Sequence, residues 1–521
     1  MRAEAVGPAW AKEGLGHRSP KFPLSVEGPV RRLVDRLVPG VSSVTKYARY
    51  YTLYAAAAVE AERRDLDAQG CRELLRRSEV LLAAVQIAQS QGGIPDGLFP
   101  HGHDGVHPRL SAGDGLDLDL TARVYSPRSW GFWSQYGAPA QVLGIVGYDG
   151  GRIRPGRHEC PTEVRELFAP LLALAGSRRT EVRPAELQEA GAAALGQPCA
   201  AERDWLASLL AATRDGMHHP EDWQATDRTR RATLRVLARA VALHGGDSYT
   251  GALRETVAFG PLLADDPVLS AAPEAARWRG LLLRHYSVSA WRRLWADFVT
   301  EVGAQEGQDG GQDRSAAELR TWLCDQVPDG TVNEALAGLG PAYDRAGHSV
   351  PVEPRLLEEE PAPWRDIRVL LVGGLRARDG ADGTHPHPGT LFAGVQRAFL
   401  GDRREFLDPM WVEALMREYG DRPVRDLASR LADDMLAQSR RVALRKLRYD
   451  PQTGGLKIFS RLHMRNDRYF RIGEESKAEI GIRIPQLGSI GRQLGLFDAD
   501  VDEAGSLTLT EAAWTSLDVG A

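Results

Sequence analysis

The spacing of hydrophobic residues predicts a mainly helical chain. A helix is expected to start at Ser42–Ser43, where a serine hydroxyl can cap it, and to continue to about residue 64. Its four tyrosines recur at i, i+3, i+4 and i+7, which places them on one helical face, where they are expected to pack in a core. A stacking or hydrogen-bonding surface beside Lys46 is the alternative. These residues are Tyr47, Tyr50, Tyr51 and Tyr54.

Further periodic segments extend this pattern. A second helix is expected over 69–91, and the stretches 160–345 and 390–446 are expected to be mostly helical because apolar residues recur at three-to-four spacing. The Gly-, His- and Asp-rich residues 93–119 are expected to form a loop. For 366–375 (DIRVLLVGGL), periodicity alone leaves a buried strand and a helix equally open.

After Arg448 the pattern changes to strands. Residues 455–473 alternate apolar with basic side chains around Asn466–Asp467, as expected of a hairpin with one solvated face. The stretch 484–497 (IPQLGSIGRQLGLF) predicts a short helix with Pro485 in its first turn. A polar turn with glycine and the strand-like SLTLTEA follow.

The order of helix, Leu-Gly-Leu-Phe, polar turn and strand over 480–515 resembles the end of a winged helix-turn-helix domain. The resemblance implies that the helix lies in the DNA major groove and that the hairpin contacts the backbone. Residues 126–156 repeat the pattern, with a helix start at Ser126–Pro127, then Leu-Gly-Ile-Val, a Gly150–Gly151 turn and Arg-Ile-Arg. Two occurrences in one chain favour an internal duplication.

These elements predict a mainly α-helical fold with small β parts, in which a helical scaffold is flanked by two winged-helix-like modules. The expected segments are an N-terminal helical region ending in the first module, 1–157; a helical middle, 158–437; and a basic C-terminal module, 438–521.

Composition and cysteine usage narrow the class of protein. Hydrophobic content of 43% and charged content of 26% across 521 residues are ordinary for globular domains. No long apolar run or signal-like segment is present, so a cytoplasmic protein without membrane contact is expected. The four cysteines lie far apart without CxxC spacing, which argues against a cysteine-based zinc module and for reduced thiols. No cofactor is expected.

Charge is distributed unevenly. The chain carries a net charge of −5, yet residues 440–471 contain ten Arg or Lys and two Asp. Only six lysines occur in the chain, and three of them fall within 446–477. This basic run favours a nucleic-acid partner over a merely solvated face.

The winged-helix resemblance gives these basic and polar residues separate roles. Phosphate contacts, which are salt-sensitive and independent of base sequence, are expected from basic side chains of the run. They are Lys446, Arg448, Lys457, Arg461, Arg465, Arg468 and Arg471. Base contacts are expected from polar residues of the reading helix, since Arg and Gln can bond base edges in pairs. They are Gln486, Ser489, Arg492 and Gln493. In the N-terminal repeat the equivalent candidates include Arg128, Arg152 and Arg154.

Two further constellations contain residue types with known chemistry. The three histidines of PHGHDGVH, His101, His103 and His107, have metal-ligand side chains but no downstream Asp-His partner. Asp467, Glu475 and Lys477 match the carboxylate-plus-lysine pattern with which many nucleases hold Mg²⁺. Each pattern is short and common. Phosphate-binding loops, GxSxG and HExxH are absent from the sequence.

The expected function is therefore a non-enzymatic, DNA-binding subunit of a bacterial multiprotein machine. A simple repressor rarely needs some 280 helical residues between two DNA-binding modules, which favours a subunit of a larger machine. The processes that would use such a machine are phage defence, genome maintenance and mobile-element function. The expected partners are double-stranded DNA and other protein subunits, with an ATPase among the candidates. Three alternatives remain open: a kleisin-like subunit bridging an SMC-type ATPase, a Mg²⁺-dependent nuclease, and a ligand-sensing transcriptional regulator.

Overall fold

The computed structural model describes two units, each built from separated parts of the chain. Unit 1 comprises residues up to Val34 together with Leu253–Ile482, and unit 2 comprises Asp35–Ala252 and Arg483–Ala521. The structure describes residues 23–90, 98–110, 115–196, 198–260, 263, 266–303, 313–337, 339, 342–343, 349–350, 352–379, 407, 409–451, 455–499 and 506–520. Two helices cross the boundaries between the units, α1 (Gly28–Leu37) and α11 (Tyr249–Leu253).

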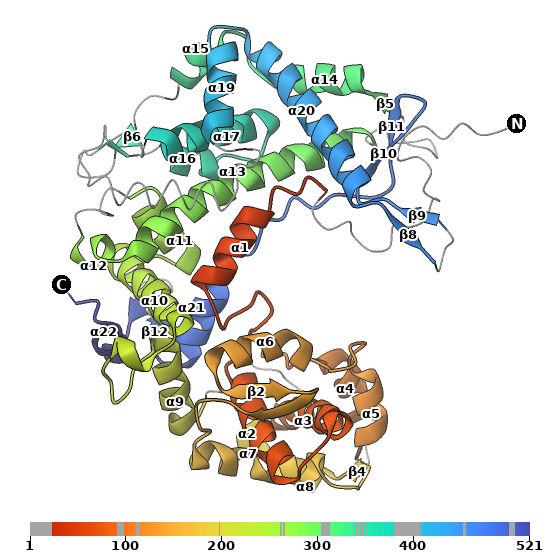
Figure 1. Ribbon diagram of the computed structural model, residues 1–521, viewed down its shortest axis with the longest axis vertical. Helices are drawn as coiled ribbons and strands as arrows, with labels where there is room; N and C mark the ends of the chain where they lie inside the picture. The colour runs from red at the N-terminus through yellow and green to blue at the C-terminus, as the bar shows by residue number, and fades with distance from the viewer. Residues whose placement is uncertain are drawn as a thin grey trace, which may run out of the picture. The chain divides into compact units, whose positions relative to one another are not determined.

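Unit 1 is organised around one long helix, α13 (Pro273–Glu301), which is buried on almost every side. Helix α17 (Pro363–Asp379) packs along it (Figure 1), so the ambiguous segment 366–375 is helical. Three tryptophans of α13 are almost fully buried, namely Trp278, Trp291 and Trp295. A buried ion pair between Arg293 of α13 and Asp366 of α17, with an N···O distance of 2.8 Å, fixes the two helices together.

The remaining helices of unit 1 pack onto this pair and onto one another. Helix α20 (Val424–Arg445) presents an apolar stripe to α14 (Ala316–Cys324), and α19 (Pro409–Tyr419) lies against α17. Shorter helical elements complete the unit: a π-helix at Arg254–Ala258, α12 (Pro267–Ser270), α15 (Val332–Ala337) and α16 (Glu353–Glu358).

The strands of unit 1 form small antiparallel sheets. The predicted hairpin is present as β10 (Leu462–Arg465) and β11 (Arg468–Arg471), and β5 (Arg314–Ser315) adds a third strand. Asn466 and Asp467 both have positive φ, 51° and 59°, as the two central residues of a tight type I′ hairpin turn require. Two further pairs are β8 (Arg448–Asp450) with β9 (Gly455–Lys457) and β6 (Ala342–Tyr343) with β7 (Ser349–Val350).

Unit 2 is built around α2 (Arg49–Arg63) and α3 (Ala68–Gln89). The four tyrosines of the predicted helical face are buried, which confirms core packing for them. The helix begins at Arg49, not at Ser42–Ser43 as predicted, because side chains from elsewhere in the unit bind the backbone amides just before it. The amides of Lys46 and Tyr47 donate to the Tyr136 hydroxyl at 3.0 and 3.1 Å.

Other elements surround these two helices. They are α4 (His103–Leu110), β1 (Leu116–Asp117), α5 (Leu118–Val124), α6 (Trp133–Leu143), β2 (Val146–Asp149), β3 (Arg152–Pro155), α7 (Thr162–Ala175), β4 (Glu181–Val182), α8 (Pro184–Glu189) and a 3-10 turn at Gly191–Ala193. Helix α4 corrects the expectation of an unbroken loop over 93–119.

Helix α6 corrects the predicted start at Ser126–Pro127. It begins at Trp133, where the amides of Phe132 and Trp133 each donate to the carboxylate of Glu79 at 2.7 Å. The hydroxyls of Tyr54 and Tyr125 donate to the same carboxylate. Burial raises the pKa of Glu79 to about 7, although all four hydrogen bonds lower it. A carboxylate from α3 thus determines where α6 starts.

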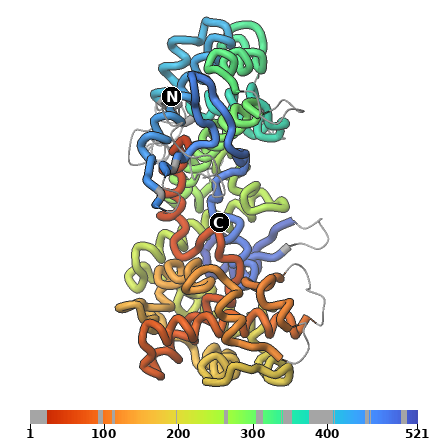
Figure 2. Tube along the Cα trace, turned by 90° about the vertical axis from the view of Figure 1, so that its right-hand side faces the viewer, coloured from red at the N-terminus to blue at the C-terminus, as the bar shows by residue number. Residues whose placement is uncertain are grey.

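The rest of unit 2 joins chain segments far apart in sequence. Helices α9 (Ala200–Ala211) and α10 (Ala225–His244), linked through a 3-10 turn at Pro220–Asp222, pack together, and the C-terminal segment returns to α10. That segment contains α21 (Ile484–Gln493), β12 (Phe497–Ala499), β13 (Leu507–Leu509) and α22 (Glu511–Leu517). In Figure 2 the C-terminal segment is blue; its strand β13 and helix α22 contact α10.

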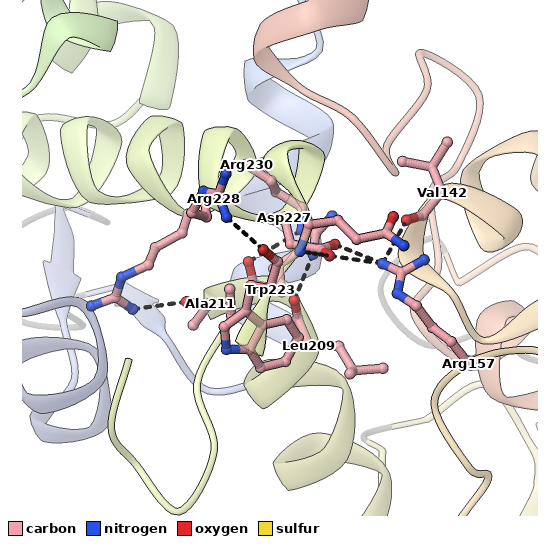
Figure 3. Close-up of polar contacts among 12 residues, drawn as sticks. Val142, Arg157, Leu209, Ala211, Trp223, Asp227, Arg228 and Arg230 are labelled. Atoms are coloured by element: carbon pink, nitrogen blue, oxygen red, sulfur yellow. Dashed lines mark hydrogen bonds and ion pairs between the residues drawn. The ribbon is translucent and has the colours of Figure 1, made fainter. Parts of the chain in front are cut away.

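A buried ionic cluster fixes the start of α10 (Figure 3). Asp227 accepts from the guanidinium groups of Arg157, at 2.8 Å, and Arg230, at 2.9 Å. Arg230 also donates to the carbonyl of Leu209 at the end of α9, at 2.7 Å. The cluster therefore provides a donor for the Leu209 carbonyl at the C-terminal end of α9. It also links Arg157, which follows β3, to α10.

The described residues thus form a mainly helical fold with small antiparallel sheets, as the sequence predicts. Among them, no helix is both long and apolar enough to cross a membrane. Four free cysteines agree with the expectation of unpaired thiols.

Candidate nucleic-acid interface

The basic run of unit 1 divides into two groups with different surroundings. The first group lies at the end of α20 and the start of β8, where the arginine side chains are exposed and have no ion-pair partner among the described residues. They are Arg440, Arg441, Arg445 and Arg448. Two large apolar side chains are exposed beside them in sequence, Leu444 at 48% and Tyr449 at 66%. We call this set the α20 basic surface.

The positions of these arginines on α20 create electrostatic repulsion. Arg441 and Arg445 are four residues apart, so their like charges face each other on the helix surface. The negative end of the helix dipole offsets part of this cost, because both residues lie in the last two turns of α20. A bound anion would remove the remaining repulsion, which makes the surface suited to phosphate groups.

The second group, on the β10–β11 hairpin, is already engaged within unit 1. Arg465 pairs with Asp313 at 3.7 Å, and Arg468 pairs with Glu318 at 3.0 Å. The Arg471 guanidinium packs against Gly303. The structure therefore brings the hairpin arginines onto neighbouring acids and backbone and leaves the α20 arginines to solvent.

Three other predicted phosphate contacts lie in mixed environments. Arg461 is buried, with 8% of its surface exposed. Lys446 is half-buried, and this burial lowers the pKa of its ammonium group while the nearby Glu27 carboxylate raises it. Lys457 lies in β9 opposite Arg448 in the strand register, and its side chain lies outside the described residues.

In unit 2, the predicted reading helix α21 contributes to the wall of an open cavity of about 840 Å³. Gln486, Ser489 and Arg492 of α21 line it, together with Lys46 and Arg203 from other parts of the unit. Gln493 also lines the cavity, but its side-chain amide is already committed. It accepts from the Ala48 amide at 2.9 Å and donates to the Lys46 carbonyl at 2.9 Å.

The two repeated segments share the same local structure. A glycine with φ of 75° closes the C-terminal end of each helix: Gly144 directly follows α6, and Gly495 comes one residue after the C-cap of α21. In each case the next amide reaches back five residues, from Ile145 to Ala140 at 3.1 Å and from Leu496 to Gly491 at 2.8 Å. An antiparallel hairpin follows each helix, β2–β3 and β12–β13. The shared Leu-Gly sequence therefore corresponds to a shared helix cap.

The N-terminal candidates have local partners. Arg128 donates to the Ser134 hydroxyl at 3.2 Å. On β3, Arg152 and Arg154 approach Asp65 at 3.5 and 3.9 Å. This hairpin is less able than the α20 basic surface to offer free cations to a phosphate backbone.

The structure does not gather the nuclease candidates. Asp467 lies in the turn at the tip of the β10–β11 hairpin, and Glu475 follows the hairpin's base. The four residues of β11 lie between Asp467 and Glu475. At about 3.3 Å per residue, they place the two carboxylates at opposite ends of a strand roughly 13 Å long. Lys477 is occupied in an ion pair with Asp297 at 2.5 Å, and burial raises the pKa of Asp297.

The histidines also have separate environments. His101 is stacked on Phe132, with ring centroids 4.7 Å apart, and burial lowers its pKa to about 4. His103 and His107 stack on each other at 5.0 Å. Within the described ranges, no three His, Cys, Asp or Glu side chains form a group that could hold a metal ion.

Sequence reasoning missed part of both surfaces. Arg203 carries no motif, and only the structure shows it in the same cavity as α21. The rarity of lysine is a signal for Lys46, but the sequence indicates only that this residue neighbours the tyrosine face. The sequence places the exposed arginines 440, 441 and 445 in the basic run and predicts no individual contacts for them.

Comparisons with protein-family models, with curated proteins and with solved structures find no significant match to this chain. Its function is therefore inferred from the chemistry of these surfaces.

Proposed function

We propose that the chain is a non-enzymatic DNA-binding subunit of a bacterial multiprotein machine, acting in phage defence, genome maintenance or mobile-element function. The observation that supports this most is the α20 basic surface, because its four exposed arginines have no ion-pair partner among the described residues. Burial or pairing of these four arginines, as found for Arg465 and Arg468 on the hairpin, would have favoured a purely structural role for them.

The chemistry of the surface fits a phosphate backbone. Arginine binds phosphate oxygens through two parallel N–H groups, and such contacts give affinity without selecting a base sequence. Exposed Tyr449 adjoins Arg448 in the sequence and offers an aromatic face against a sugar or an unstacked base. In this proposal unit 1 supplies general affinity for DNA.

The two helix–hairpin segments of unit 2 support a finer part of the proposal, that they are winged-helix modules. Their common glycine cap and following hairpin match what the resemblance implies for a helix and its wing. The wing arginines of the first module are paired with Asp65, which favours a protein-binding or structural role for that copy.

The decisive experiment measures duplex binding as a function of salt. Removing two phosphate contacts should reduce the slope of log affinity against log salt by about 2, since each contact contributes about 0.9 on B-DNA. We expect Arg441→Gln/Arg445→Gln in the full chain to show this reduction and to bind a 30-base-pair duplex at least about tenfold more weakly at low salt.

A matched double variant controls for net charge. Arg178→Gln/Arg417→Gln also removes two exposed arginines, but both lie outside the basic run. It should leave the salt slope unchanged. Equal slopes for both double variants, or an affinity of the unsubstituted chain that does not respond to salt between 50 and 200 mM, would contradict the proposal.

A further inference from the structure

The polar face of α21 lies in a recess. Besides residues of α21, the cavity of about 840 Å³ is lined by Arg203 of α9 and by Leu195 and Pro198. A helix with its side chains is about 10–12 Å across, and the major groove is about 12 Å wide. A helix that reads a duplex must therefore stand clear of its surroundings. The flanking wall makes the α21 face better suited to a smaller ligand.

The charges around this recess favour an anion. Three cationic side chains line it, Lys46, Arg203 and Arg492, against a single carboxylate, Asp498. In the described part of the chain none of the three cations forms an ion pair. They come from three separate segments, so tertiary folding gathers three positive charges around one negative charge, that of Asp498. Such an arrangement costs free energy unless an anion is bound.

The remaining lining suits an organic group attached to that anion. Gln486 and Ser489 offer hydrogen-bonding side chains, and Leu195 with Pro198 provides an apolar wall. The volume lies within the range of about 300–1,000 Å³ that is typical of small-molecule sites. A ligand with a phosphate, a polar middle and a flat apolar ring would use each of these features.

We propose that this cavity binds a nucleoside phosphate, with the phosphate held by Lys46, Arg203 and Arg492 and the base placed against the apolar wall. The phosphate ester could belong to a free nucleotide or to the end of a nucleic-acid strand, since both present the same chemistry. The site uses residues of unit 2 only and does not depend on the α20 basic surface.

Calorimetric titration of the full chain with ADP, with adenosine and with 5′-phosphorylated trithymidylate tests the proposal. ADP is expected to bind at micromolar to submillimolar concentration and adenosine at least about tenfold more weakly, because adenosine lacks the phosphate groups that accept charge-assisted hydrogen bonds from the three cations. Tighter binding of the trinucleotide than of ADP would assign the site to a strand end, and the reverse order to a free nucleotide.

Variants locate the ligand. Arg203→Gln should weaken binding of the better phosphorylated ligand at least about tenfold, whereas Arg178→Gln, outside the cavity, should not change it. If Arg203→Gln lowers the thermal unfolding temperature, Lys46→Gln serves the same purpose, because Lys46 is an exposed side chain. The proposal is overturned if neither phosphorylated ligand binds at 1 mM, or if both cavity variants bind like the unsubstituted chain. Binding of ADP without salt-sensitive duplex binding would leave this site standing while the DNA proposal fails.

Discussion

At the scale of single residues, the Asp227 cluster shows how a few buried charges hold unit 2 together. The Asp227 side chain is 1% exposed and that of Arg230 is fully buried. Folding therefore removes water from both charges, and their ion pair replaces part of the lost hydration. Removing one member of such a pair leaves an uncompensated buried charge, which is far more costly than losing a surface contact.

We therefore expect Asp227→Asn to lower the free energy of unfolding by about 3 kcal/mol or more, measured by urea denaturation. The control is Asp518→Asn, which neutralises a carboxylate that is 78% exposed and pairs with Arg235. That change should cost less than about 1 kcal/mol. Similar losses in the two variants would show that the buried cluster contributes no more than a surface pair.

At the scale of elements, the two helix caps allow a direct comparison. Gly144 and Gly495 have the same φ, but a Cβ at Gly144 would collide with the Arg157 guanidinium, whereas a Cβ at Gly495 would meet nothing within 4 Å. Gly495→Ala should therefore cost only the backbone strain, about 1–2 kcal/mol. Gly144→Ala should cost more, because Arg157 must also leave Asp227. Urea denaturation of both variants measures the difference, and an equal or smaller loss for Gly144→Ala would contradict this account.

The elements also show what the sequence could predict. The tyrosine face, helix α3, the Asn466–Asp467 hairpin and the α21 helix depend on local periodicity and turn chemistry, and all four are present. The starts of α2 and α6 were missed, because their amides are bound by Tyr136 and Glu79, which are distant in sequence. Local patterns cannot contain such partners.

For the candidate sites, too, the sequence predicts only the features that depend on local composition. Net charge located the basic run, but which of its arginines are paired depends on where Asp313 and Glu318 lie after folding. The cavity is lined by residues of α9 and α21, which lie almost 300 residues apart in the sequence, so no motif could have predicted it. The DNA and machine assignments stay predictions until binding is measured.

At the scale of the whole molecule, the discontinuous units have a consequence for fragments. Residues 438–521 were expected to form one module, yet they are shared between the two units. Helix α20 and strand β11 have partners in α14 and β5, and β13 and α22 pack on α10. The isolated 438–521 fragment should therefore show no cooperative thermal transition by circular dichroism, under conditions in which the full chain does. A sigmoidal transition for the fragment would contradict this division.

The same discontinuity sets an order of events during synthesis. Unit 2 begins at Asp35 but needs residues 483–521 to cover α10, and the whole of 253–482 is translated in between. At about 5–20 residues per second this interval lasts roughly 10 to 50 s. Throughout it, the face of α10 that will receive β13 and α22 lacks those partners, and Arg231 and Arg235 lack the C-terminal carbonyls to which they donate in the folded unit. All residues of unit 1 have been synthesised once residue 482 is added, whereas unit 2 is complete only after residues 483–521 have followed.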